Sequence, residues 1–204
     1  MKNSILTILA VAAMVACKKN QTTTSDQSAD SASMMTPADT MITGDSATTG
    51  MTDSDAQNKM LSEQDKKFAD AAAKGGMMEV MIGELAETNA NNATVKSLGA
   101  MMVKDHSKAN DELKNWAAAT GYTLPTSLDA KKQKMYDDLK AKKGTEFDRA
   151  YTDLMVTDHK EDIAEFKKQA AEGSETSLKS FASTTLPTLE HHLMESEKAK
   201  KAVN

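Results

Sequence analysis

Apolar residues recur every three or four positions through most of the chain after Asn58. This spacing is typical of amphipathic helices that bury one face. It predicts four long helices over residues 62–89, 92–119, 145–172 and 175–202, and a short helix over 128–142. The alternation typical of strands is nearly absent. The pattern therefore predicts an all-α fold.

Residues that end helices stand at the predicted joints. They are Asn89 to Asn92, Gly121 with Pro125, Gly144, and Gly173 with Ser174. Two of these joints are so short that each must connect an antiparallel helix pair. The first and second long helices form one such hairpin, and the third and fourth form the other.

The segment 120–144 predicts how the two hairpins are related. A helix of about 15 residues spans roughly 22 Å, and its flanking residues add about 26 Å when extended. This connector can run the length of the bundle, so the second and third long helices should be parallel. The sequence thus predicts a ferritin-like four-helix bundle, up-down-down-up, with a short extra helix between the second and third long helices.

The first residues have the layout of a bacterial export signal. Lys2 supplies a positive charge, and Ile5 to Val15 form an apolar run too short to span a bilayer as a stable helix. The run ends in Met14-Val15-Ala16-Cys17, which resembles a lipobox and contains the only cysteine. The resemblance implies a lipoprotein signal peptide over 1–16 and lipidation of Cys17. The open alternatives are an ordinary secretory signal or a free buried thiol.

A lipid on Cys17 would place the protein in the cell envelope, with the membrane as its partner. The residue after the cysteine is Lys18 rather than Asp. In the sorting pattern known from well-studied Gram-negative bacteria, this favours the outer membrane. The lipobox resemblance therefore implies an outer-membrane lipoprotein.

Residues 17–58 differ in composition from the rest of the chain. They are rich in Ser, Thr, Asp, Ala and Gln and contain no aromatic residue. Such a segment cannot bury enough apolar surface to offset its ordering entropy, which predicts a disordered tether before a bundle domain over 59–204. Its methionines are either a composition bias or soft copper ligands. They are Met34, Met35, Met41 and Met51.

The net charge of the chain is −5, and most of it lies in the predicted tether. Neither a basic block nor a basic stripe with interleaved aromatic residues is present. Nucleic acid is therefore not expected as a partner.

The phrase Met-Val-x-Asp-His occurs twice, at 102–106 and 155–159. In both predicted helices its histidine, His106 or His159, falls on the apolar stripe. Glu79 and His192 fall on the stripes of the first and last long helices. Counting residues from the joints puts the four side chains at compatible heights, given how helical side chains lean.

Glu79, His106, His159 and His192 therefore form a candidate mononuclear metal site. Neutral imidazoles with one carboxylate suit Zn, Cu or Fe. Asp105 and Asp158 are candidate acceptors for a ring N–H of the same or an adjacent helix. Further candidates around the site are Met102 and Met155, whose sulfur atoms would favour copper, and Tyr151, a hydrogen-bonding neighbour.

The same residues also suit a purely structural role. An inward histidine is usually hydrogen-bonded within the core, and a Glu-His network can specify the register of a bundle. A third alternative is that some of them face outward. A di-iron site is disfavoured because it needs Glu-x-x-His pairs on two helices, and the sequence has none.

Catalytic motifs are lacking. The chain has no Gly-x-Ser-x-Gly and no Gly-rich phosphate loop. The sequence therefore does not predict an enzyme, and an oxidoreductase or metal-storage enzyme is the least favoured class.

Three positions interrupt the helical pattern. Gly75 and Gly76 lie inside the first helix, where each costs roughly 1 kcal/mol against Ala, so they indicate a close helix approach or a kink. Pro187 should bend or interrupt the last helix. His191, beside His192, is expected to face elsewhere.

Four motifs together resemble a bacterial family, the domain-of-unknown-function 4142 family, often labelled predicted outer-membrane or putative membrane proteins. They are GGMMEVMIGELA (75–86), VKSLGAMMVKDHSKANDEL (95–113), FDRAYTDLMVTDH (147–159) and FASTTLPTLEHHL (181–193). The resemblance covers residues 62–200 and implies a ferritin-like fold and an envelope location. In its LP-x-L-x-x-His pattern the matching histidine is His192. It implies no activity and no metal.

Two functional hypotheses follow. The first is an exported, lipid-anchored and non-enzymatic envelope protein whose bundle binds one Cu, Zn or Fe ion. The second is a structural or partner-binding lipoprotein whose Glu-His cluster is a core polar network. The sequence identifies no protein partner.

Overall fold

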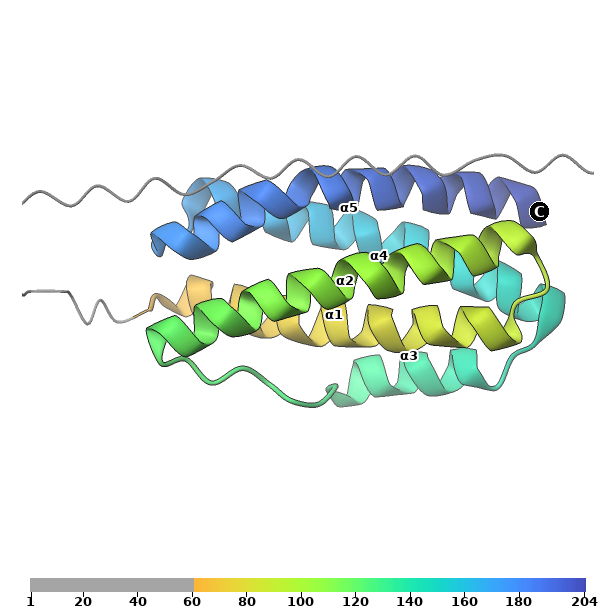
Figure 1. Ribbon diagram of the computed structural model, residues 1–204, viewed down its shortest axis with the longest axis horizontal. Coiled ribbons are helices and arrows are strands. Elements are labelled where there is room, and N and C mark those ends of the chain that lie inside the picture. Colours follow the sequence, from red (N-terminus) through yellow and green to blue (C-terminus); the bar gives the residue numbers. More distant parts are fainter. Residues whose placement is uncertain (1–60) are drawn as a thin grey trace, which may run out of the picture. The chain divides into compact units, whose positions relative to one another are not determined.

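The computed structural model describes residues 61–204, which form five helices (Figure 1). The predicted signal peptide, the predicted lipidation site at Cys17 and the predicted tether lie outside the described residues. The helices are α1 (Glu63–Asn89), α2 (Ala93–Thr120), α3 (Ala130–Lys140), α4 (Gly144–Glu172) and α5 (Thr176–Val203). No helix among the described residues is both long and apolar enough to cross a membrane.

Polar side chains set the starts of four helices by accepting free backbone N–H groups. Ser62 caps α1 by accepting from the N–H of Asp65, and Asn92 caps α2 by accepting from that of Thr94. Asp129 and Glu175 do the same for α3 and α5. Because Asp129 caps α3, that helix is shorter than its predicted range 128–142.

The topology agrees with the prediction made from joint lengths. α1 packs along α2, and α4 packs along α5. In Figure 1, α3 carries the chain back beside α1, so that α2 and α4 run in the same direction. Contacts also join α1 to α4 and α2 to α5. The fold is therefore the predicted all-α, up-down-down-up bundle with an extra helix.

The bundle has two apolar clusters with a polar layer between them. One cluster contains Ile82, Met102 and Phe147, and the other contains Phe68 and Leu113. The turns of α1, α2, α4 and α5 between these clusters carry buried polar residues. This polar layer holds the candidate ligands.

Close approach of α1 and α2 depends on glycines. A Cβ on Gly76 would clash with Oδ1 of Asn110, which confirms the expected close contact at one of the paired glycines. A second contact, Gly83 against Gly99, was not predicted. A Cβ on Gly99 would lie 2.8 Å from the carbonyl oxygen of Gly83 and 2.5 Å from Cβ of Ala86.

Gly99→Ala is expected to destabilise the fold by about 1–3 kcal/mol, because the new methyl group must push two helix backbones apart. Gly75→Ala is the matched control, since its Cβ would make only a 3.9 Å contact with Nζ of Lys132. There the gain in helix propensity should leave stability unchanged or higher. Urea denaturation followed by circular dichroism measures both. Equal stability of the two variants would contradict the close packing at Gly99.

Pro187 does not break α5. The helix runs without interruption from Thr176 to Val203 with Pro187 inside it. The sequence predicts either a bend or an interruption at this position, and the predicted interruption is wrong. Buried Ala182 and Leu189 pack on either side of the proline, so tertiary burial holds the helix together across it.

Candidate metal centre

Four polar side chains, one from each long helix, meet in the polar layer. Glu79 on α1 is 1% exposed, His106 on α2 is 6% exposed, and His159 on α4 and His192 on α5 are fully buried. The neighbouring His191 is exposed, as expected. The apolar stripes thus place all four candidate ligands in the interior.

The three imidazoles form a compact group. Their ring centroids are separated by 5.7 Å (His106 to His159), 5.1 Å (His106 to His192) and 5.2 Å (His159 to His192). Each ring offers one nitrogen, and these three atoms lie within 4.8 Å of one another. The structure therefore brings the three predicted histidines to one point.

Each imidazole is also held from outside by an oxygen atom. Nδ1 of His159 donates to the backbone carbonyl of Met155 at 3.0 Å, and Nε2 of His192 donates to Oδ2 of Asp105 at 3.0 Å. Nδ1 of His106 lies 2.9 Å from Oε2 of Glu79. Such outer contacts fix the tautomer and orientation of a ring whose other nitrogen binds a metal.

The nitrogens left over face inward. Nε2 of His159 and Nδ1 of His192 lie 3.2 Å apart, and Nε2 of His106 is buried without a hydrogen-bond partner. Two neutral rings carry two protons, and in His159 and His192 both are used in the outer contacts. With these tautomers the facing nitrogens present two lone pairs to each other, an arrangement that a shared cation would satisfy.

Burial keeps the imidazoles neutral. It lowers the pKa of His159 to about 3 and the pKa values of His106 and His192 to about 4. For His192, the hydrogen bond to Asp105 partly opposes this lowering of the pKa. Neutral imidazole is the form that ligates metals.

Glu79 lies on the outer side of the imidazoles and joins a group of carboxylates. One oxygen atom from each of Glu79, Asp158 and Asp162 lies within 4.8 Å of the others. Burial, and then the charge of Asp158, raises the pKa of Glu79 well above its usual value. Burial also raises the pKa values of Asp158 and Asp162. The only cation paired with this group among residues 61–204 is Lys132, whose Nζ lies 3.9 Å from Oδ1 of Asp158.

The flanking residues have different roles from one another. Asp105 reaches across to His192 on another helix, whereas Asp158 pairs with Lys132. Met102 and Met155 belong to the apolar cluster near Phe147, and Met155 holds His159 through its backbone oxygen. Tyr151 stacks on Phe147 and buries a hydroxyl with no partner. The flanking residues that contact the imidazoles or the buried carboxylates thus do so through oxygen and nitrogen atoms.

Sequence reasoning missed Asp162 and Lys132. Asp162 lies one turn after His159 and one turn after Asp158, on the same side of α4 as the buried carboxylates. Lys132 comes from α3, and no periodicity in the chain indicates where that helix docks. A signal for Asp162 existed in the spacing Asp-x-x-aromatic, which occurs at Asp65 with Phe68 and at Asp148 with Tyr151. When these two phrases are aligned in the sequence, Asp162 takes the position that corresponds to Glu79.

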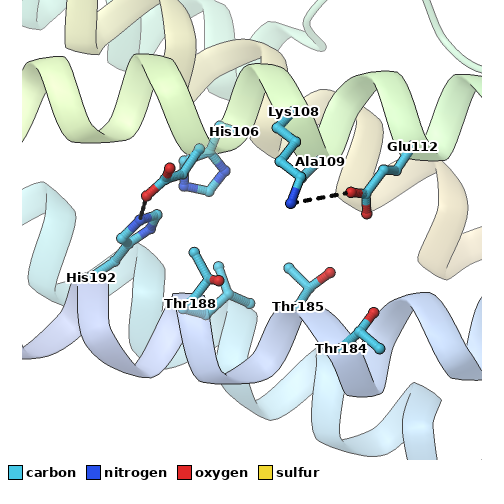
Figure 2. Close-up of a pocket in the computed structure, with 10 residues that line it drawn as sticks. His106, Lys108, Ala109, Glu112, Thr184, Thr185, Thr188 and His192 are labelled. Atoms are coloured by element: carbon cyan, nitrogen blue, oxygen red, sulfur yellow. Dashed lines mark hydrogen bonds and ion pairs between the residues drawn. The ribbon is translucent and has the colours of Figure 1, made fainter. Parts of the chain in front are cut away.

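A pocket of about 130 Å³ leads from the surface to the imidazoles. Figure 2 shows it between α2, which carries His106, Lys108 and Glu112, and α5, which carries His192 and several threonines. The pocket is small and its lining is mostly polar. It gives an ion or small ligand access to two of the three rings.

Comparison with known proteins identifies the family. A family model described as "Domain of unknown function (DUF4142)" matches residues 50–199. The chain belongs to this family. The match confirms the resemblance drawn from the four motifs.

Other comparisons concern the fold. The structure is similar to that described as "Crystal structure of DUF305 fragment from Deinococcus radiodurans", with a TM-score of 0.61 and 11% sequence identity. The similarity covers 70% of this chain and 98% of that one. At this identity the likeness shows the fold alone. No curated protein matches the DUF4142 chain.

Proposed function

We propose that the protein is an exported, lipid-anchored envelope protein whose bundle binds one transition metal ion through His106, His159 and His192. The observation that carries the metal proposal is the pair of facing nitrogens on His159 and His192, 3.2 Å apart. In a tetrahedral site with Zn–N bonds of 2.0–2.1 Å, neighbouring nitrogens are about 3.3 Å apart. An ion between the rings satisfies both lone pairs at once.

His106 would supply the third ligand through Nε2, which has no hydrogen-bond partner among residues 61–204. A metal on Nε2 leaves the proton on Nδ1, where Oε2 of Glu79 accepts it. Glu79 then orients the ring of His106 instead of binding the ion directly. Asp105 and the carbonyl of Met155 hold the other two rings in the same way.

Three imidazoles suit Zn, Cu or Fe. The pocket at His106 and His192 leaves room for a further ligand such as water. Sites with three protein ligands and one open position exchange ligands readily, unlike closed structural sites. We assign the protein a role in binding or holding a metal in the envelope, with no catalytic group of its own.

Export and anchoring rest on the sequence. Lys2, the apolar run and Met14-Val15-Ala16-Cys17 support a lipoprotein signal, and Lys18 supports the outer membrane. Radiolabelled palmitate tests this directly, because it should label the wild-type chain and not a Cys17→Ser variant. Label in both chains would contradict the anchor.

Asp105→Ala tests the outer contacts of the metal site. It removes the acceptor that holds His192, so metal affinity is expected to fall by about 10–100-fold. Asp111→Ala is the control, because Asp111 lies on the same helix and pairs only with exposed Lys114. Competition with a chromophoric chelator gives the dissociation constants. Equal affinities in the two variants would contradict the role of Asp105.

A structural polar network is the second candidate function. Its support is that Glu79, His106, His159, His192 and Asp105 already form a connected set of contacts. In that case the network fixes helix register and the surface serves a protein partner. The two candidate functions differ in the metal content of the protein after dialysis. A polar network alone retains no metal, whereas the metal site does.

A further inference from the structure

The carboxylates of Asp158 and Asp162, which adjoin Glu79, are not explained by the imidazole site. The three carboxylates come from α1 and α4, and one oxygen atom of each lies within 4.8 Å of the others, with Glu79 and Asp158 buried and Asp162 half-buried. Oε1 of Glu79 and Oδ2 of Asp158 are buried and accept no hydrogen bond from the part of the chain that the structure describes. Three acidic groups in one place repel one another when ionised, and either protonation or a shared cation relieves that repulsion.

A separate cavity adjoins this group. It measures about 20 Å³ and is lined by Glu79, Asp162 and His106, with Gly75 and Gly76 on the α1 side. A space of this size holds about one water molecule. The cavity therefore offers room for a single ion beside Glu79 and Asp162, whereas Asp158 lies outside its lining.

Within residues 61–204, Lys132 is the one lysine or arginine paired with the group. Lys132 contacts Asp158 alone, at 3.9 Å. Its ammonium group passes over Gly75, where a Cβ would lie 3.9 Å from Nζ. One ammonium group at one edge leaves the oxygen atoms of Glu79 and Asp162 without a cation.

We propose that Glu79, Asp158 and Asp162 form a second cation site, which takes a hard divalent ion such as Mn²⁺. Carboxylate oxygens are the donors that Mg²⁺, Ca²⁺ and Mn²⁺ prefer, whereas imidazoles suit Zn, Cu and Fe. The two sites thus differ in donor chemistry. Lys132 is the internal cation that a bound metal ion competes with.

Glu79 links the two sites. Its Oε2 lies against His106, while its Oε1 belongs to the carboxylate side, 3.5 Å from Nδ1 of His159. The proposal extends the metal-binding function but fails independently of it, because Asp158 and Asp162 hold none of the three imidazoles.

The test is a Mn²⁺ titration of the full chain, loaded beforehand with zinc and dialysed. Electron paramagnetic resonance reports free Mn²⁺, whose six-line signal is lost on binding. The wild-type chain is expected to bind about one Mn²⁺ per chain, and Asp162→Asn to weaken that binding at least about tenfold with its zinc content unchanged. Asp111→Asn, an exposed carboxylate change, is the control and should bind Mn²⁺ as the wild type does.

Lys132→Met gives an opposite expectation. Removing the competing ammonium group should tighten Mn²⁺ binding, by about tenfold or less. Circular dichroism checks that each variant is folded. If Lys132→Met does not fold, the near-isosteric Asp162→Asn variant still provides the test.

The outcomes separate the two sites. No Mn²⁺ binding by the wild type, or equal Mn²⁺ binding by wild type and Asp162→Asn, would overturn the second site whatever the zinc result. Mn²⁺ binding that depends on Asp162 in a chain that retains no zinc would uphold the second site and contradict the imidazole site.

Discussion

Replacing both His106 and His159 with alanine is expected to abolish tight zinc binding. One ring remains of three, so the loss should exceed the roughly 10–100-fold that removal of an orienting partner costs. Equilibrium dialysis of the full chain against zinc, followed by metal analysis, measures it. The expected result is a wild-type chain with zinc retained and a double variant with essentially none.

His191→Ala is the matched control for this experiment. His191 adjoins His192 in the chain, yet its side chain is exposed and lies outside the imidazole group. It should leave zinc content unchanged. Wild-type zinc content in the double variant would show that these residues are not the ligands, and loss in His191→Ala would point to surface binding.

Zinc should also stabilise the protein, and only where the ligands are intact. At free zinc about 1,000 times the dissociation constant, binding to the native state alone adds about 4 kcal/mol. For a folded part of this size that corresponds to a rise in Tm of roughly 10 °C. The double variant should show no such rise in a thermal melt.

Asp148→Ala is expected to produce the largest loss of stability. This carboxylate is 3% exposed and accepts the backbone N–H groups of Asn91 and Asn92, both at 3.0 Å. It thereby ties the start of α4 to the joint between α1 and α2. Alanine removes the acceptor of both N–H groups, for a cost of about 2–4 kcal/mol, or a fall in Tm of roughly 5–10 °C.

Asp153→Ala provides the comparison on the same helix. Asp153 is exposed and pairs with Lys200 at 2.8 Å on the surface, so its removal should cost about 0.5 kcal/mol or less. Thermal and urea denaturation by circular dichroism measure both variants. A loss of stability no greater for Asp148→Ala than for Asp153→Ala would contradict the role of Asp148 at the joint.

The opposite end of the bundle uses a related device. Asp65, near the start of α1, accepts from the N–H of Ser174 at 3.1 Å, in the joint between α4 and α5. Gln169 also donates to Asp65. Each hairpin thus holds the joint of the other hairpin through an aspartate near the start of its own first helix. This relation supports a pseudo-two-fold arrangement of the hairpins.

Much of the fold could be predicted from local signals. Asn89, Gly121 and Gly173 mark helix ends because their backbone preferences act within a few residues. The relative directions of the long helices could be predicted from the lengths of the joints and of the connector alone. The contact between Gly83 and Gly99 could not be predicted, because it depends on the rotation of two helices about their own axes.

Part of the candidate site could also be predicted from local signals in the sequence. Periodicity places His106, His159 and His192 inward, but it does not say which ring nitrogen each oxygen atom holds. The twice-repeated Met-Val-x-Asp-His illustrates the limit. Asp105 holds His192, whereas Asp158 faces Lys132, and only the packing of neighbouring helices makes two identical phrases differ.

The most direct test of the central claim is the coordination of the metal in the loaded wild-type chain. X-ray absorption at the zinc edge, with metal content measured on the same sample, reports both ligand type and stoichiometry. The account predicts about one zinc per chain, with imidazole nitrogens at about 2.0–2.1 Å in its first shell. Less than about 0.1 zinc per chain after reconstitution, or a shell of oxygen atoms alone, would contradict it.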